Sequence, residues 1–229
     1  MAAIGRGVTV IFVVPEKFSM EKQQLMKALG ARIVNTPSEE GMTGAIRKAE
    51  QLVKEIPGSF SPGQFSNPAN PETYYKTLAP EIWRDLKGEI DVFVAGAGSG
   101  GTFMGTARYL KERNPRLKTA IVEPEGSILG GGEPGSHRTE GIGVETLAPF
   151  MDVAYFDAVH TIRDEDAFDR VKELALLEGL LVGSSSGAAL HAALVEAEKA
   201  APGSRIVTVF PDSSERYLSK HIYEGSMPI

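Results

Sequence analysis

The sequence predicts an α/β protein built from two open parallel-type sheets flanked by helices. Three observations predict this class. Short apolar runs alternate with stretches whose apolar residues recur at helical spacing. The apolar runs are rich in β-branched residues, which is typical of parallel strands covered by helices. Finally, residues 59–71 (SFSPGQFSNPANP) break the alternation and indicate a crossover between two lobes.

The part before this crossover contains two strand–helix pairs. Residues 8–14 (VTVIFVV) form a continuous apolar run closed by Pro15, the pattern of a strand buried on both faces. Ser19 suits the N-cap of a helix that follows, and Gly30 suits the residue after its end. The expected elements are helices over 20–29 and 42–56 and a second strand over 32–35.

The part after the crossover contains the larger share of the elements. A helix over 73–86 is expected to be kinked by Pro80. Residues 123–149 are the longest irregular stretch, and a loop this long inside a compact domain is usually functional. Asp164 is expected to cap the helix that it begins. The remaining elements are strands over 92–95, 117–122, 156–162 and 205–210 and helices over 102–111, 164–178 and 183–200.

Composition excludes several classes of function. The chain of 229 residues has a net charge of −6 and no basic run, so nucleic acid is not an expected partner. No apolar run approaches the length of a membrane span, and the N-terminus lacks the features of a signal peptide. The absence of cysteine excludes disulfides and thiolate chemistry and fits a cytoplasmic protein. The four histidines show no metal-ligand spacing, so no metal site is expected.

A glycine-rich turn between a strand and a helix is the clearest motif. Glycines at 96, 98, 100 and 101 let the backbone approach a ligand, and the following helix start presents unpaired N–H groups to an anion. The spacing also satisfies the dinucleotide fingerprint, with Glu123 roughly twenty residues further on, where a ribose-binding carboxylate would lie. A nicotinamide enzyme is therefore one candidate, and a turn that only packs helix on strand is another. The hydroxyls of Ser99 and Thr102 favour a phosphate.

A second turn of glycine and hydroxyl residues, 183–187 (GSSSG), lies at another strand-to-helix junction. Taken alone, its serines are best explained as helix caps. Two such turns at the carboxyl ends of parallel strands nevertheless predict a shared crevice. The turn also resembles a nucleophile elbow, but His191 lies one helical turn away on the same helix, which is the wrong geometry for a base, so a hydrolase is disfavoured.

Together these pieces resemble the cysteine synthase (O-acetylserine sulfhydrylase) and cystathionine β-synthase family. Its members are pyridoxal-phosphate enzymes of fold type II, with the architecture of the tryptophan synthase β subunit. The resemblance covers essentially the whole chain in order. It is carried by residues 15–21 (PEKFSME), 29–32 (LGAR), 64–71 (QFSNPANP), 95–102 (AGAGSGGT), 137–143, 183–188 and 211–217.

The resemblance implies pyridoxal 5'-phosphate as the cofactor and assigns roles by position. Ser185 matches the serine that hydrogen-bonds the pyridine nitrogen of the cofactor. Gln64 matches a glutamine near the substrate carboxylate, and Gly141 belongs to a loop that lines the cofactor side of the cleft. The residues that match the phosphate-binding loop are Gly98, Ser99, Gly100, Gly101 and Thr102. Glu123 thereby loses its ribose role.

The chain departs from the family pattern at its start. Family members carry the lysine that binds the cofactor covalently, and a Ser/Thr-Gly-Asn-Thr-Gly loop, upstream of the point that Met1 matches. Lys17, Lys22 and Lys76 do not stand in the context of that lysine. The resemblance therefore implies no catalytic residue within this chain. We expect it to be part of a longer protein, or a truncated product without turnover.

The implied reaction joins O-acetylserine and sulfide to give cysteine and acetate, and cystathionine synthesis from homocysteine is the sister alternative. Residues 123–129 and 211–213 look more like the cystathionine branch, whereas 64–71 and 215–218 look like cysteine synthase. An alternative of another class is a catalytically dead scaffold that binds serine acetyltransferase. We expect a homodimer acting on a small amino-acid substrate. Residues 1–66 would be the remainder of the smaller substrate-side lobe, and 67–229 the larger cofactor-binding lobe.

Overall fold

The structure, a computed structural model, describes residues 1–224. It contains two compact units, and each is described by itself. The first comprises Met1–Pro62 and Glu215–His221, and the second comprises Gly63–Ser214 and the residues from Ile222. Compactness does not assign a role to either unit, so the division into a substrate-side lobe and a cofactor lobe stays a prediction.

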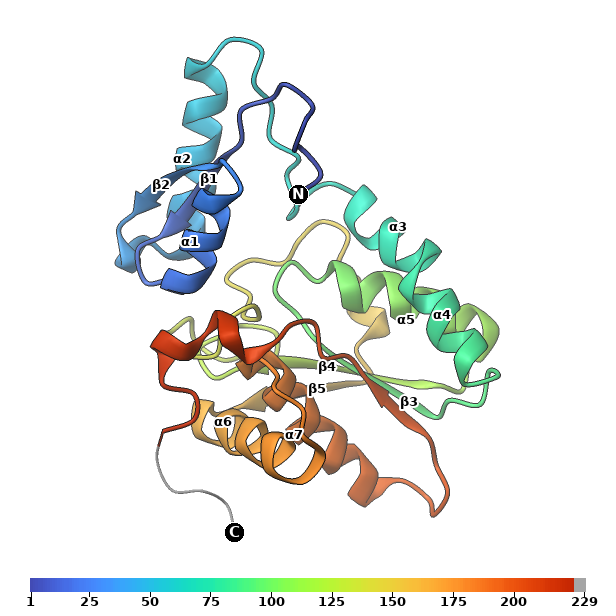
Figure 1. Ribbon diagram of the computed structural model, residues 1–229. Helices are drawn as coiled ribbons and strands as arrows, with labels where there is room; N and C mark the ends of the chain where they lie inside the picture. Colours follow the sequence, from blue (N-terminus) through green and yellow to red (C-terminus); the bar gives the residue numbers. More distant parts are fainter. Residues whose placement is uncertain (225–229) are drawn as a thin grey trace. The chain divides into compact units, whose positions relative to one another are not determined.

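The first unit is a pair of parallel strands with two helices (Figure 1). Ser19 caps the first helix as expected, because its hydroxyl accepts a hydrogen bond from Lys22 N at 3.1 Å. Gly30 follows that helix with φ of +86°, the left-handed conformation that glycine adopts readily. The elements are β1 (Ile11–Pro15), α1 (Met20–Ala28), β2 (Arg32–Thr36) and α2 (Gly41–Glu55).

The expected burial of the first strand on both faces is wrong. The strand begins at Ile11 rather than at Val8, and the side chain of Phe12 is 41% exposed. Val14 and Pro15 are buried. A β-branched run reports the fit of side chains to a pleated surface, whereas burial depends on what covers each face of the sheet.

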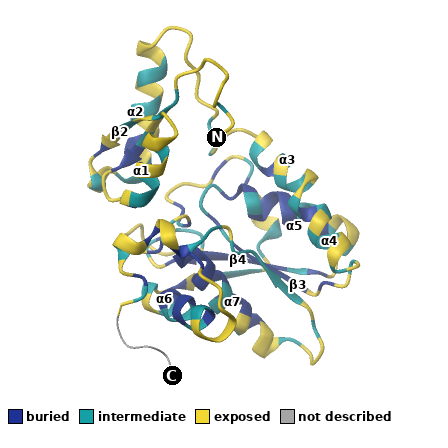
Figure 2. Cartoon of the chain, in the orientation of Figure 1, coloured by how far each residue is buried: buried dark blue, intermediate teal, exposed yellow. Residues whose placement is uncertain are grey.

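The second unit is built on a four-stranded sheet in the order β5-β4-β3-β6, and all of its strand pairs are parallel. Helices α6 and α7 cover one face and α5 lies on the other (Figure 1). Strands β3 and β4 are the buried centre (Figure 2). This confirms the α/β class. The elements are α3 (Ala69–Lys76), α4 (Leu78–Asp85), β3 (Val92–Gly96), α5 (Gly101–Arg113), β4 (Lys118–Pro124), β5 (Ala158–Ile162), α6 (Asp164–Glu173), α7 (Ser184–Lys199) and β6 (Ile206–Thr208).

The helix expected over residues 73–86 is two helices, α3 and α4. The chain breaks at Thr77, whose φ of −120° and ψ of −81° are not helical. Pro80 lies in the first turn of α4, where a backbone N–H would have no acceptor within the helix. Proline is tolerated there, so Pro80 is accommodated in the first turn of a new helix and does not kink a continuous one.

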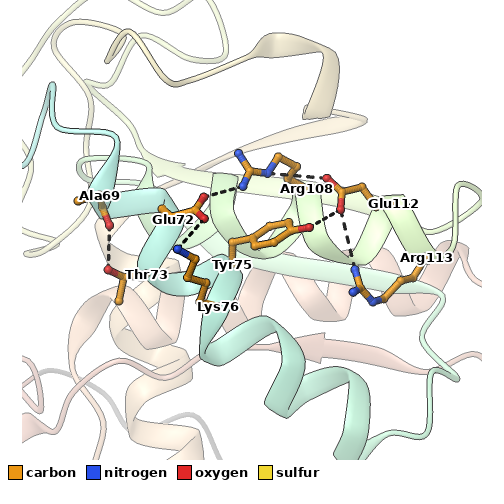
Figure 3. Close-up of polar contacts among 8 residues, drawn as sticks. All are labelled: Ala69, Glu72, Thr73, Tyr75, Lys76, Arg108, Glu112 and Arg113. Carbon is orange, nitrogen blue, oxygen red and sulfur yellow. Dashed lines mark hydrogen bonds and ion pairs between the residues drawn. The ribbon is translucent and has the colours of Figure 1, made fainter.

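Helix α3 packs closely on α5 through a glycine and a row of charged side chains. A Cβ added to Gly105 would overlap the carbonyl oxygen of Pro71, so only glycine allows this approach. Glu72 accepts a hydrogen bond from Arg108 at 2.8 Å, and this bond lowers the pKa of Glu72 (Figure 3). Tyr75 donates from its hydroxyl to Glu112 at 2.6 Å (Figure 3). Helices α3 and α5 are therefore held in a fixed relation along their length.

Candidate functional site

The glycine-rich turn joins β3 to α5, as the sequence predicts. Gly100 is the residue before the helix, and its φ of +83° is left-handed. A Cβ added to Gly98 would lie 2.6 Å from the carbonyl oxygen of Gly141, a backbone atom that cannot easily move. Glycine is therefore required at these positions by conformation and by close approach. Thr102 follows Gly101 in the first turn of α5 and is half-buried.

Asn70, in the first turn of α3, is a residue that the sequence reasoning missed. Its Nδ2 donates to Ser99 Oγ at 2.9 Å and to the carbonyl oxygen of Gln64 at 2.8 Å. A Cβ on Gly101 would overlap the Asn70 amide. One side chain thus links the Gln64 segment to the glycine-rich turn. The side chain of Gln64 itself is exposed.

The loop 141–143 lies directly against the same turn. Gly143 N donates to the carbonyl oxygen of Ala97 at 2.8 Å, and a Cβ on Gly96 would lie 2.6 Å from Ile142 Cγ2. Gly141 and Gly143 both have positive φ, of +92° and +115°. The prediction that this loop lines the cofactor side stays a prediction, but its contact with the glycine-rich turn is a structural fact.

The serines of the second turn do not cap α7, so that expectation is wrong. Gly183 is the N-cap and makes no side-chain cap bond, which leaves the three serine hydroxyls for other partners. Ser184 Oγ accepts a hydrogen bond from Glu140 N at 3.0 Å. Ser185 is only 4% exposed, and its Oγ lies 3.7 Å from where a Cβ on Gly141 would be. The two turns therefore meet at the loop that contains Gly141.

Asp164 holds the residues that precede this loop by hydrogen bonds and is not the cap of α6. The N-cap is Arg163, and Asp164 occupies the first helical position. Its carboxylate accepts from Arg138 N at 2.6 Å, from Thr139 N at 2.8 Å and from Thr139 Oγ1 at 2.6 Å. On the other side of the loop, Val144 N donates to Ser127 Oγ at 2.8 Å. The segment is irregular in backbone but fixed at both ends.

Glu123, the candidate for a ribose contact, has a structural role. Its side chain is 0% exposed. It accepts from Leu129 N at 2.8 Å, from Gly130 N at 2.7 Å and from Thr161 Oγ1 at 2.9 Å. Three donors already occupy this carboxylate, and the arrangement gives no support to a nicotinamide dinucleotide.

All of the residues predicted for the site lie in the second unit. The structure brings together the turn 98–101, Gly141, Ser185 and the backbone of Gln64. Backbone N–H groups at a helix start, together with hydroxyl groups, form a donor set suited to a phosphate. Within residues 1–224, no three His, Asp or Glu side chains are grouped so as to hold a metal ion. No helix of that same range combines the length and apolarity needed to cross a bilayer.

Comparison with known proteins identifies relatives along nearly the whole chain. The family described as "Pyridoxal-phosphate dependent enzyme" matches residues 1–212. An O-acetylserine dependent cystathionine β-synthase of Bacillus subtilis is 63% identical over 221 residues, which are 96% of this chain and 72% of that protein. A cysteine synthase of Helicobacter pylori is 57% identical over 223 residues, 97% of this chain and 73% of that protein.

Solved structures agree with these relatives. The crystal structure of an O-acetylserine dependent cystathionine β-synthase from Helicobacter pylori matches with a TM-score of 0.95 and 58% identity, over 97% of this chain and 72% of that one. An O-acetylserine sulfhydrylase isoform from Entamoeba histolytica matches with a TM-score of 0.89 and 36% identity, over 100% of this chain and 69% of that one. The chain belongs to the pyridoxal-phosphate-dependent enzymes of fold type II, in the cysteine synthase and cystathionine β-synthase family.

Proposed function

We propose that the chain binds the phosphate of pyridoxal 5'-phosphate at the turn 98–102. The close approach of Gly98 to the Gly141 carbonyl leaves no room for a side chain, and Gly100 turns the backbone so that the start of α5 faces the turn. Backbone N–H groups of this turn, with the hydroxyls of Ser99 and Thr102, would hold the phosphate oxygens. The residues present therefore fit this group.

Ser185 would meet the ring nitrogen of the cofactor. The observation that supports this is its position beside Gly141, which also contacts the phosphate turn. When bound, pyridoxal phosphate stabilises negative charge that develops at the α-carbon of an amino acid. A neutral hydroxyl at the ring nitrogen leaves that nitrogen unprotonated and weakens this capacity, which suits elimination at the β-carbon. We assign no catalytic residue within this chain.

The reaction that we propose is β-replacement on O-acetylserine. The C–O bond at the β-carbon breaks and acetate leaves; the sulfur of sulfide then forms a C–S bond there, and cysteine results. The observation that carries this is the identity of 57% to a protein named cysteine synthase, together with the site just described. Gln64 would lie near the substrate carboxylate.

A second candidate acceptor is homocysteine, which would give cystathionine. It is favoured by the 63% identity to a protein named O-acetylserine dependent cystathionine β-synthase. Both candidates use the same donor, and the acceptor alone separates them. We further propose a cytoplasmic homodimer, and serine acetyltransferase as a partner if the chain serves as a scaffold.

Product analysis with both acceptors in competition tests the proposal. The purified protein is supplied with pyridoxal phosphate, O-acetylserine, sulfide and homocysteine, and the amino acids formed are separated by mass. Cysteine as the main product supports the first candidate, and cystathionine supports the second. Acetate release with neither product would contradict β-replacement. Retention of the protein by a serine acetyltransferase tail peptide, without acetate release, would favour the scaffold.

A further inference from the structure

The amide of Asn70 contacts the glycine-rich turn in a way that fixes the direction of its hydrogen bonds. Its Nδ2 lies 2.8 Å from the carbonyl oxygen of Gln64 and 2.9 Å from Ser99 Oγ. A carbonyl oxygen can only accept, so the atom that meets Gln64 must be the NH₂ group. The same NH₂ group then donates its second hydrogen to Ser99. The orientation of this amide is therefore determined by chemistry.

This arrangement leaves the Ser99 hydroxyl as a donor. Within the described residues, Ser99 Oγ accepts from Asn70 at 2.9 Å and lies at the limit of a bond from Gly101 N, at 3.5 Å. Because both contacts use its lone pairs, its hydrogen is not needed by either neighbour. A phosphate offers acceptor oxygens only, so a serine that can donate is the useful one.

We propose that Asn70 is a positioning residue that sets the direction of hydrogen bonding at the phosphate site. It keeps the Ser99 hydroxyl directed as a donor toward the cofactor phosphate and ties the Gln64 segment to the same turn. Gly101 takes part, because a side chain there would overlap the Asn70 amide. This inference rests on the proposed phosphate site and extends it to a residue outside the glycine-rich turn.

Replacement of Asn70 by aspartate exchanges the NH₂ donor for an acceptor oxygen with almost no change in shape. A carboxylate at 70 can only accept, so it would take the Ser99 hydrogen away from the ligand and would face the Gln64 carbonyl without a hydrogen. We expect Asn70→Asp to weaken pyridoxal phosphate binding at least about tenfold, the range for a lost bond to a charged group. Asn70→Ala, which removes the donor without adding charge, should weaken it several-fold.

Asn67→Asp is the matched control. Asn67 lies three residues earlier, and its Oδ1 accepts from Ala69 N at 2.9 Å, a bond that aspartate retains. The control makes the same change in charge and should bind pyridoxal phosphate within about twofold of the parent protein. Binding is measured by titration of apo-protein fluorescence, and the ³¹P NMR shift of the bound phosphate should move in Asn70→Asp but not in Asn67→Asp.

The Ser99→Ala background shows whether Asn70 acts through Ser99. There, the loss caused by Asn70→Asp should shrink by at least about threefold, because the hydroxyl that it misdirects is gone. An undiminished loss in that background, or parent-like binding by Asn70→Asp, would overturn the inference. Failure of the parent protein to bind pyridoxal phosphate would instead overturn the proposed function. Thermal unfolding of the apo variants detects misfolding, and in that case Asn70→Ala decides.

Discussion

Two turns of the second unit, each rich in glycine and hydroxyl residues and each followed by a helix, are built differently. The first follows β3, whereas the second, within residues 1–224, follows no strand, contrary to expectation, because Val182 forms only an isolated antiparallel bridge with Ser213. In residues 96–102, glycine is required by the backbone itself, through the left-handed Gly100 and the approach of Gly98 to the Gly141 carbonyl. In residues 183–187, Gly183 has an ordinary extended conformation, and Gly187 is required by packing, since a Cβ there would overlap the carbonyl oxygen of Ala167. The first turn offers backbone groups, and the second offers hydroxyls.

The difference teaches that a glycine-rich turn does not define a ligand site by itself. The two turns are brought together because a third segment touches both. Gly143 N bonds to Ala97 in the first turn, and Glu140 N bonds to Ser184 in the second. Four variants test this difference between the two turns and the segment that joins them, from the largest expected effect to the smallest.

Gly98→Ala should break the first turn. Its Cβ would lie 2.6 Å from the Gly141 carbonyl oxygen, so the turn or the loop must shift. We expect pyridoxal phosphate affinity to fall by about 100-fold, measured by fluorescence titration. Gly203→Ala is the control, because a Cβ there meets nothing within 4 Å, so its only cost comes from the positive φ of Gly203. An affinity within about twofold of the parent would contradict the role of Gly98.

Gly187→Ala should affect folding more than ligand binding. The new Cβ would push α7 away from the Ala167 carbonyl of α6, and such overpacking costs about 1–3 kcal/mol. Urea denaturation measures this change in the free energy of unfolding. Gly98→Ala should lose mainly affinity for pyridoxal phosphate, whereas Gly187→Ala should lose mainly free energy of unfolding. Equal losses of affinity in the two variants would mean that the turns are not distinct in function.

Asp164→Asn should loosen the third segment. The carboxylate accepts three hydrogen bonds from residues 138 and 139, and a neutral amide replaces one acceptor oxygen by a donor. We expect a loss of about 1–2 kcal/mol and faster hydrogen exchange at residues 138–144. Asp166→Asn is the control, since Asp166 pairs with Arg163 and makes the same charge change. Unchanged exchange would show that the loop is held without Asp164.

Glu196, near the far end of α7, gives the smallest expected effect. Burial raises its pKa, but hydrogen bonds from Lys118 and His160 outweigh this and hold the pKa below the ordinary value of 4.5. Its contribution to stability is therefore present above pH 4.5 and is lost as the pH falls through the lowered pKa of the folded state. Glu196→Gln should flatten the dependence of the melting temperature on pH below 4.5, and the exposed Glu198→Gln should not. If the melting temperature of the parent, Glu196→Gln and Glu198→Gln proteins fell identically below pH 4.5, Glu196 would not be the group responsible.

Much of the fold was predictable because it depends on local pattern. The parallel sheets, the Ser19 cap and the left-handed Gly30 follow from residue type and spacing. Several expectations were wrong, and in three of them tertiary partners decide the outcome. Phe12 of the first strand is exposed, Asp164 bonds to a loop, and the serines after Gly183 are not caps. Another concerns Pro80, which lies in the first turn of a new helix after the break at Thr77.

The site was predictable in part. The two turns are recognisable by their composition, but Asn70 is not, because an asparagine at a helix start is common. Its partners lie on other segments, 6 and 29 residues away along the chain. Its only sequence signal was its place in the motif 64–71, which resembles that of the family. Single-residue geometry of this kind requires coordinates.

The bond between Glu140 N and Ser184 Oγ spans 44 positions along the chain. It has a consequence for biosynthesis, since a growing chain emerges from the ribosome N-terminal end first. The glycine-rich turn leaves the ribosome first, but the turn 183–187 cannot pack beside it until the start of α7 has been translated. If this is the cofactor site that we propose, nascent chains that stop before Ser184 should not retain pyridoxal phosphate.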